Sequence, residues 1–245
     1  MVSAPAGVQH QLLELQSVDT SLAQTDYKKQ NLPDAVRLQE LSNTLAERQA
    51  DLARAKTQAH DLSLEQAKAD NDVELVRARR DRDQARLDGG QGSAKDLSNL
   101  MHEVETLSRR QSELEDVELE IMERLESARE LVDSLTSKVD ELSVQRADLR
   151  TRVDQQTADL DSDVARLAAA RAAMLPELPP DLLALYERIR TSMNGAGVGA
   201  AALRQGRCEG CRMPLAPTEL ARISSLGDDA VVQCDECRRI LVRVR

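Results

Sequence analysis

The chain has almost no aromatic side chains. Phe and Trp are absent, and Tyr27 and Tyr186 are the only aromatic residues among 245. Because aromatic side chains supply much of the buried surface of globular cores, an ordinary globular core is not expected. The sequence also lacks a basic or apolar leader and any apolar run of roughly 18 residues, the length that spans a bilayer. We therefore expect a cytoplasmic protein with no membrane contact.

Catalytic signatures are missing as well. His10, His60 and His102 are scattered, with no clustered ligands or nucleophile around them. The glycines at 89, 90 and 92 follow a helical pattern and lack the Lys-Ser/Thr ending of a phosphate-binding loop. We expect no enzymatic activity and no small-molecule substrate.

What the chain does have is Leu, Ala and Val among 31% charged residues, a mixture typical of long helices that bury a narrow seam. The formal net charge of -10 is unevenly distributed. Residues 1–199 carry a net charge of -12, whereas residues 200–245, with 8 Arg and 6 acidic residues, carry +2. This asymmetry indicates that the two ends contact different partners.

A heptad pattern dominates the second half of the chain. Alternate steps of three and four residues from Leu97 to Met174 meet an apolar residue at 18 of 23 positions. The polar exceptions are Gln111, Glu118, Arg146, Gln156 and Asp163. This unbroken register predicts one very long coiled-coil helix.

A weaker seam of the same spacing runs upstream from Leu38 to Leu87. Between the two seams, residues 88–93 hold three glycines in four positions, which predicts a turn. A helical break is expected near 31–33, where Pro33 interrupts the pattern. We therefore predict that residues 1–175 form an antiparallel coiled-coil hairpin whose two arms pair along their length.

A group of arginines lies just before the predicted turn. Antiparallel pairing places Arg77, Arg79 and Arg80 opposite residues 101–105, so Glu103 and Glu105 are the expected cross-helix partners. An exposed nucleic-acid patch is the alternative interpretation.

The hairpin should end near Leu175, because prolines follow at 176, 179 and 180. Residues 176–199 are predicted to be a linker with a short helix, from Asp181 to about Met193, that carries Leu182, Leu185, Tyr186 and Ile189 on one face. Residues 194–197 end this linker, and residues 200–245 are assigned to a separate small domain.

All four cysteines lie in this small domain, as two Cys-x-x-Cys pairs separated by 22 residues: Cys208, Cys211, Cys234 and Cys237. Two such pairs supply the four thiolates of a tetrahedral zinc site, and the β-prone segments 231–233 and 240–244 suit a zinc ribbon. Four protein ligands leave no open coordination position, so we expect one structural zinc ion. A pair of redox dithiols is the alternative, but it would need a thioredoxin-like context that the sequence lacks.

The predicted fold is thus mainly α, a long antiparallel coiled-coil helical hairpin with a small C-terminal β zinc ribbon. This layout resembles a bacterial family of coiled-coil proteins with a C-terminal C4-type zinc ribbon, long catalogued as a domain of unknown function. The resemblance is carried by residues 185–190 (LYERIR), 206–215 (GRCEGCRMPL) and 234–241 (CDECRRIL). It implies zinc ligation by the four cysteines. It also implies roles in nucleic-acid binding, or with partner proteins in flagellar or secretion-linked regulation.

Two details depart from the family pattern. Many relatives have Gly after the last Cys and Tyr after the Ile-Leu pair, whereas this chain has Arg238 and Val242. The missing aromatic ring argues against base stacking by the ribbon.

Two functional hypotheses remain open. In the first, the chain is a zinc-binding regulatory adaptor whose ribbon binds RNA or DNA. The expected phosphate contacts are Arg207, Arg212, Arg238 and Arg239, helped by Arg204, Arg243 and Arg245. Part of this Arg content can instead neutralise the negatively charged zinc-thiolate centre. In the second hypothesis, the acidic coiled coil is a scaffold or chaperone-like adaptor for protein partners and no nucleic acid is bound.

Overall fold

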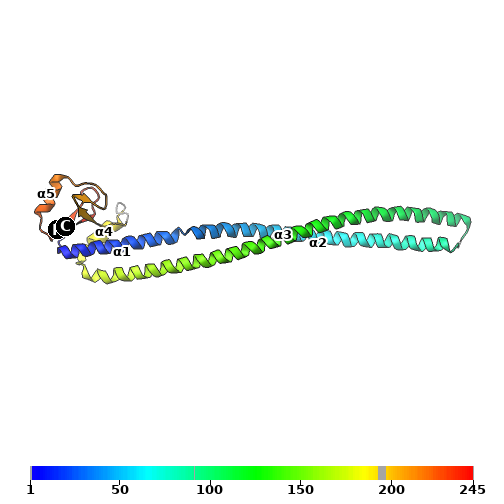
Figure 1. The fold of residues 1–245 in the computed structure, drawn as a ribbon, viewed down its shortest axis with the longest axis horizontal. Coiled ribbons are helices and arrows are strands. Elements are labelled where there is room, and N and C mark those ends of the chain that lie inside the picture. Colours follow the sequence, from blue (N-terminus) through cyan, green and yellow to red (C-terminus); the bar gives the residue numbers. More distant parts are fainter. Residues whose placement is uncertain (1, 91, 193–196, 245) are drawn as a thin grey trace. The chain divides into compact units, whose positions relative to one another are not determined.

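The computed structural model describes residues 2–90, 92–192 and 197–244. Three long helices come first, α1 (Ala6–Gln30), α2 (Pro33–Asp88) and α3 (Ala94–Met174). A short 3-10 helix, η1 (Leu175–Glu177), leads to α4 (Pro180–Thr191). The remaining elements are β1 (Ala200–Arg204), β2 (Arg207–Cys208), α5 (Pro217–Ser225), β3 (Val232–Gln233) and β4 (Ile240–Arg243) (Figure 1). The chain divides into two compact units, residues 36–150 and residues 1–35 with 151–245, and each is described by itself.

The unit 36–150 is an antiparallel pair of helices made by parts of α2 and α3. Leu62 of α2 packs with Leu125 and Ala128 of α3 in one buried cluster, with Ala59 against it. The buried positions of both helices repeat at the spacing of the predicted seams: Leu45, Ala55, Leu62 and Val73 in α2, and Leu100, Gln111, Leu125, Ala128, Leu142 and Leu149 in α3. The predicted coiled-coil hairpin is confirmed.

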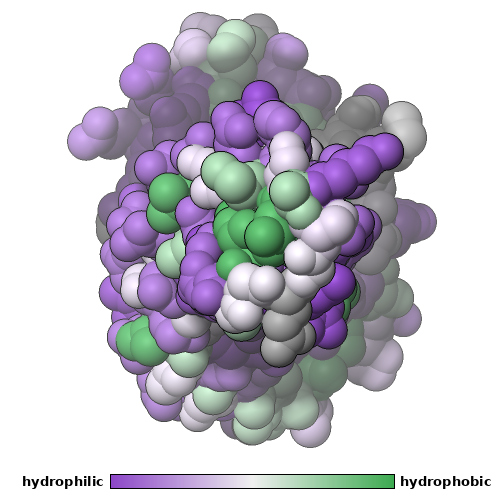
Figure 2. Space-filling view, turned by 90° about the vertical axis from the view of Figure 1, so that its right-hand side faces the viewer, coloured by the Kyte–Doolittle hydropathy of each residue, from purple (hydrophilic) through white to green (hydrophobic). Residues whose placement is uncertain are grey.

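The turn between α2 and α3 uses glycine where the backbone requires it. Gly90 and Gly92 have φ angles of 63° and 137°, a region that residues with a Cβ adopt only under strain. Gln91 lies outside the described residues. Ser93 and Asp96 form a capping box at the start of α3, and the hydrogen bond from the Ser93 hydroxyl lowers the pKa of Asp96. Figure 2, which looks onto this end of the hairpin, shows a small apolar area surrounded by hydrophilic side chains.

The arginines before the turn make cross-helix contacts. Arg79 pairs with Glu103, as expected. Arg77 instead reaches Glu115 at 3.4 Å, and Arg80 donates to Gln111 Oε1 at 2.7 Å, so these two contacts fall further along α3 than predicted. Gln111 is buried, and its amide also donates to Glu115. A polar exception in the seam is therefore satisfied by a cross-helix hydrogen bond, a device that favours one register of a coiled coil.

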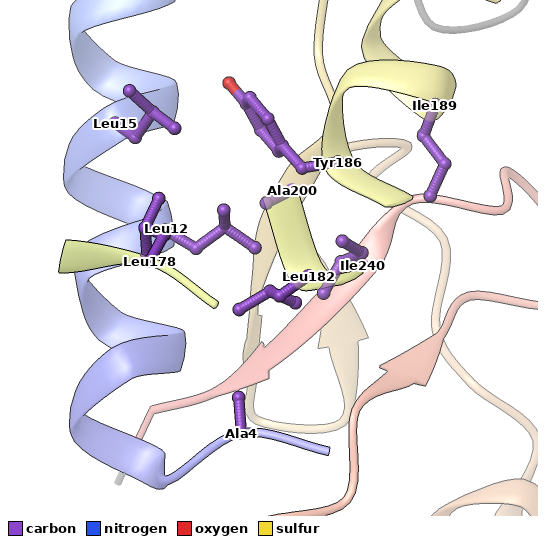
Figure 3. Packing of buried hydrophobic residues seen from close by; sticks show 9 residues of the cluster. All are labelled: Ala4, Leu12, Leu15, Leu178, Leu182, Tyr186, Ile189, Ala200 and Ile240. Atoms are coloured by element: carbon purple, nitrogen blue, oxygen red, sulfur yellow. The ribbon is translucent and has the colours of Figure 1, made fainter. Parts of the chain in front are cut away.

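The second unit has a core of its own where α1 meets α4 and the sheet. Figure 3 shows Leu12 and Leu15 of α1 facing Leu182 and Tyr186 of α4. Ile240 of β4 closes this core, and all five side chains are nearly or fully buried. The predicted apolar face of the short helix thus packs into a core.

The ribbon is a four-stranded sheet in the order β2-β1-β4-β3. β1 and β4 run parallel, and the outer pairs are antiparallel. A second apolar cluster surrounds the metal centre. It contains Ile223 of α5, Val232, Leu241 and the two buried cysteines, Cys208 and Cys234. The strands that the sequence predicted around 231–233 and 240–244 are present as β3 and β4.

Residues 176–199 are more than a linker. The prolines do end α3, but the segment that follows forms η1 and α4, and α4 packs against α1 and the sheet. Residues 193–196, which include the end of the predicted short helix and most of the predicted link, lie outside the described residues.

The N-terminal segment also joins the ribbon, since the Ala4 N–H donates to Asp229 O at 2.8 Å and Ser3 bridges Ala230. The ribbon is therefore packed into a unit with the N-terminal helix. Among the described helices, none is long and apolar enough to cross a membrane.

Candidate metal centre

The two Cys-x-x-Cys segments adopt the same backbone turn. The N–H of Arg212 donates to Cys208 O at 2.7 Å, and the N–H of Arg238 donates to Cys234 O at 2.8 Å. Each turn places the residue after its second cysteine at positive φ, 62° for Arg212 and 60° for Arg238. Each first cysteine also donates its own N–H to a carbonyl five residues later, Cys208 to Met213 at 3.1 Å. Two equivalent knuckles therefore present two sulfurs each.

The four sulfurs converge. Cys208 Sγ lies 3.8 Å from Cys237 Sγ, Cys211 Sγ lies 3.9 Å from Cys234 Sγ, and all four lie within 4.8 Å of one another. These distances are far too long for disulfide bonds. The two shorter distances match the edges of a zinc tetrahedron, which are about 3.8 Å for Zn–S bonds of about 2.3 Å. The residues fit one zinc ion, which they would hold as four thiolates, and the predicted structural cofactor is confirmed.

The protein environment shifts the pKa values of the cysteine thiols in different directions. Burial raises the pKa of Cys208 to about 12, although the N–H groups of Cys211 and Gly210 point at the sulfur and oppose the effect. Burial raises the pKa of Cys234 in the same way. Burial also acts on Cys211, but the Met213 N–H and the neighbouring thiols together outweigh it and lower the pKa. Backbone N–H groups aimed at the sulfurs are the arrangement that stabilises thiolates on a metal.

Arg239 does not fit its expected role as a phosphate contact. Its side chain is 9% exposed, and its Nε donates to Val198 O at 3.2 Å. A Cβ on Gly210 would lie 2.8 Å from Arg239 Cδ and 2.9 Å from Ala201 Cβ, so the guanidinium stem packs directly over the first knuckle. Arg239 is a packing residue of the metal centre because its position beside the second knuckle turns it inward.

Arg243 is likewise used inside the fold. Its Nη2 donates to Gly227 O at 2.7 Å and to Ala230 O at 3.1 Å. Its Nη1 reaches carbonyls at the end of α5, Ile223 O at 3.5 Å and Leu226 O at 3.4 Å. These bonds fix the loop between α5 and β3, so the earlier expectation of phosphate contact does not suit Arg243. Arg245 lies outside the described residues.

Three other arginines gather on one face of the ribbon. Arg204 and Arg207 are register partners across the β1–β2 hairpin, whose turn residues Gln205 and Gly206 have φ angles of 48° and 73°. With Arg212 they line a hollow of about 740 Å³. Arg207 and Arg212 are exposed, and Arg204 lies 3.6 Å from Glu209, which lines the same hollow. Arg238 is exposed but is not part of this lining.

Sequence reasoning missed the polar cluster that ties α1 to the ribbon. The Gln16 side chain accepts from the Gly199 N–H at 2.6 Å at the start of β1. The buried Asp19 accepts from the Tyr186 hydroxyl at 2.6 Å and from Arg171 Nε at 2.6 Å. Gly199 has no room for a Cβ, which would lie 2.7 Å from the Tyr186 ring. The signal in the sequence was the helical spacing of Gln9, Gln16 and Asp19, which places these polar residues on one side of α1. The structure shows that all three are buried.

Within the described residues, the four cysteines are the only group of His, Cys, Asp and Glu side chains close enough together to hold a metal ion. The fold and this site define the class: a zinc-binding coiled-coil protein with a C-terminal ribbon. The chain belongs to the CT398-like coiled-coil hairpin family, whose model matches residues 15–194. A C4-type zinc ribbon domain matches residues 207–241. The resemblance drawn from the sequence is thereby confirmed.

Individual relatives agree with this assignment. The uncharacterized protein Rv2229c of Mycobacterium tuberculosis is 35% identical over 244 residues, which cover 98% of this chain and 97% of that protein. A solved structure from Mycobacterium smegmatis is also 35% identical, covers 99% of this chain and 100% of its own, and has a TM-score of 0.85. The structure of CT398 from Chlamydia trachomatis, at 15% identity, has a TM-score of 0.68 over 97% of this chain and 98% of its own. At that identity the likeness shows the fold alone.

Proposed function

We propose that this protein is a non-catalytic adaptor whose zinc ribbon binds the phosphates of RNA or DNA through Arg204, Arg207 and Arg212. The observation that carries the proposal is the gathering of these three side chains around one hollow. Arginine forks match phosphate oxygens, and a metal-fixed knuckle and a tight hairpin hold their positions. Four protein thiolates complete the zinc coordination, which leaves no position for a substrate.

The binding should be weak and insensitive to sequence. The part of the hollow's lining that the structure describes contains no aromatic ring on which a base could stack. The hairpin, with its excess of acidic residues, repels phosphate, so contact should be confined to the ribbon. Affinity should therefore fall steeply as salt rises.

Salt dependence provides the test. In the full-length protein, Arg207→Ala combined with Arg212→Gly should flatten the slope of log affinity against log salt for single-stranded RNA. The expected change is about 1.4 for two lost phosphate contacts. Glycine is chosen at 212 because that residue has positive φ, so the knuckle is not strained. Arg222→Ala combined with Arg238→Gly is the matched control, since it also removes two positive charges from the ribbon but touches neither of the substituted residues nor the lining of the hollow.

Metal analysis of the variants should still give one zinc per chain. If the full-length protein shows no affinity for RNA or DNA even at low salt, the ribbon does not have this role. Equal effects of the control and of the paired substitutions would mean that only net charge matters, and this outcome would also contradict the proposed contact.

Protein scaffolding is the second candidate, and the exposed apolar side chains of the hairpin favour it. The unit 36–150 exposes Leu64, Leu75, Met101, Val117, Leu119, Met122, Leu131 and Val144. Leu119 and Met122 are three residues apart and share one side of α3. Exposed apolar groups of this kind mark docking sites on helices. Recovery of one protein partner at high salt, dependent on Leu119 and Met122, together with no retention of nucleic acid, would favour the scaffold.

A further inference from the structure

The break between α1 and α2 leaves a hollow beside α3. α1 ends at Gln30 and α2 begins at Pro33, so the helical surface that would cover this part of the α3 seam is interrupted. Gln156 and Leu160 are the seam residues at this level, and Gln156 Nε2 donates to Asp34 Oδ2 at 3.2 Å across the break. The resulting hollow has a volume of about 440 Å³. Its lining includes Tyr27, Lys28, Leu32, Gln156, Asp159 and Leu160.

The walls of the hollow are apolar, and an aromatic ring lines it. Leu32, Pro33 and Leu160 form the walls. Tyr27 is 68% exposed, whereas the other tyrosine, Tyr186, is fully buried. In a chain so poor in aromatic residues, an exposed ring beside an apolar hollow is an unusual use of a side chain that carries much of the energy at protein interfaces.

The polar groups of the hollow favour a cation that donates hydrogen bonds. Asp159 lines it with a carboxylate that accepts one bond from Gln155, at 2.8 Å. Gln156 Oε1 is buried and has no hydrogen-bond partner in the part of the chain that the structure describes. An acceptor without a donor is a destabilising feature that a ligand can relieve.

We propose that this hollow receives an arginine side chain from a protein partner. A guanidinium can lie flat on the Tyr27 ring and donate to the Asp159 carboxylate, while its methylene stem covers Leu160. It has five N–H donors, so one remains for Gln156 Oε1 once the amide turns towards the hollow. The excess of acidic residues over residues 1–199 attracts such a basic segment. The proposal rests on this hollow alone and stands apart from the role of the ribbon.

Lys28 also lines the hollow, and its positive charge allows the preference for a cation to be tested. Its side chain is exposed, so its ammonium group can extend into solvent on a flexible stem. Its positive charge nevertheless repels a guanidinium at short range. Removing it should therefore strengthen binding, the opposite of what loss of a contact residue would do.

The two tyrosines make the site observable in the full-length protein. Incorporation of 3-fluorotyrosine gives two ¹⁹F signals, and Tyr27→Phe identifies the exposed one. N-butylguanidinium, a mimic of the arginine side chain, should shift the Tyr27 signal in a saturable way and leave the Tyr186 signal in place. Neutral N-butylurea, which has nearly the same shape, should bind about three-fold or more weakly.

Variants distinguish arginine recognition from simple apolar binding. Asp159→Asn and Gln156→Leu should weaken butylguanidinium binding, and Lys28→Ala should strengthen it. Gln156→Leu should also raise the melting temperature, because the removal of a buried unsatisfied acceptor outweighs the loss of the single 3.2 Å bond to Asp34. Gln111→Leu is the matched control: Gln111 is another seam glutamine, but both of its amide atoms are hydrogen-bonded, so its loss should lower the melting temperature.

Three outcomes would overturn the proposal. Equal affinity for butylurea would show an apolar occupant. A Tyr27 signal that moves with protein concentration in the absence of any probe would show that a second copy of the chain covers the hollow. A shift that does not saturate, or that the Asp159 and Gln156 variants leave unchanged, would show that the hollow binds no guanidinium.

Discussion

At the scale of single residues, the most unusual positions are the two arginines that follow the knuckles. Arg212 and Arg238 have positive φ, which costs a residue with a Cβ about 1 kcal/mol or more. Glycine adopts this conformation without that cost. Both arginines are exposed, so nothing in their surroundings requires the larger side chain for packing.

Arg238→Gly should therefore stabilise the ribbon by about 1 kcal/mol. The bond from the residue 238 N–H to Cys234 O is kept, because it involves only the backbone. Slower zinc release to a chelator in moderate denaturant would measure the gain. Arg207→Gly is the control, since residue 207 lies in β2 and glycine there should speed release. Faster release from Arg238→Gly would contradict this account of the knuckle.

Tyr186 makes a pH-dependent contribution to stability. Burial, followed by the hydrogen bond to Asp19, raises the pKa of Tyr186 far above its ordinary value of about 10. The folded protein therefore holds this proton more tightly than the unfolded chain does. The stabilisation is complete below about pH 10 and is lost progressively as the pH rises above it.

Absorbance of tyrosinate and helical circular dichroism, recorded together on Tyr27→Phe, should change in a single step at alkaline pH. In this variant Tyr186 is the only tyrosine. Its ionisation requires the core of α1 and α4 to open. Formation of tyrosinate while that core stays intact would show that the phenol is not buried against Asp19.

At the scale of elements, Asp19 joins α1 to the end of α3 and to α4. Its side chain is 2% exposed and lies 2.6 Å from Arg171 Nε and 3.5 Å from Arg190 Nε. Asp19→Ala would leave Arg171 and Arg190 with Glu187 as their remaining carboxylate and the buried Tyr186 hydroxyl with a longer bond to Gln16, and should destabilise the unit by about 2 kcal/mol. Chemical denaturation compared with Asp26→Ala, at an exposed position of the same helix, would measure the difference. Equal losses for both variants would show that the cluster contributes nothing specific.

The long helices and the metal ligands could be predicted from the sequence. The polar contacts by which Gln16 and Asp19 join α1 to α3, α4 and β1 could not. Seam periodicity and the spacing of four cysteines are local signals, and each depends on one repeated rule. The contacts of Gln16 and Asp19 link α1 to residues more than 150 positions later, so no local pattern carries them. Arg239 was misjudged for the same reason. Its type and position suggested an exposed charge, and only the packing over Gly210 shows that it turns inward.

At the scale of the whole molecule, the metal centre and the core of α1 and α4 belong to one unit. The sheet is the physical link, because Ala200 and Ile240 lie in the α1–α4 core while their neighbours Ala201 and Leu241 lie in the cluster around the metal centre. The first pair of residues in the parallel pairing of β1 and β4 thus lies in one core, and the next pair lies in the other. Loss of the metal should loosen both faces of these strands, so its effect should reach beyond the ribbon.

Hydrogen exchange on the full-length protein can test this coupling. Zinc removal, or Cys234→Ser, should raise exchange in the ribbon, in α4 and in the first part of α1, because those helices lose the strands against which they pack. Residues 36–150 have their own seam and should keep their protection. Helical circular dichroism should accordingly fall by a small fraction only. If exchange rises in the ribbon alone, the joint made by Gln16 and Asp19 holds α1 and α4 without the sheet. If it rises throughout 36–150 as well, the two units do not unfold separately.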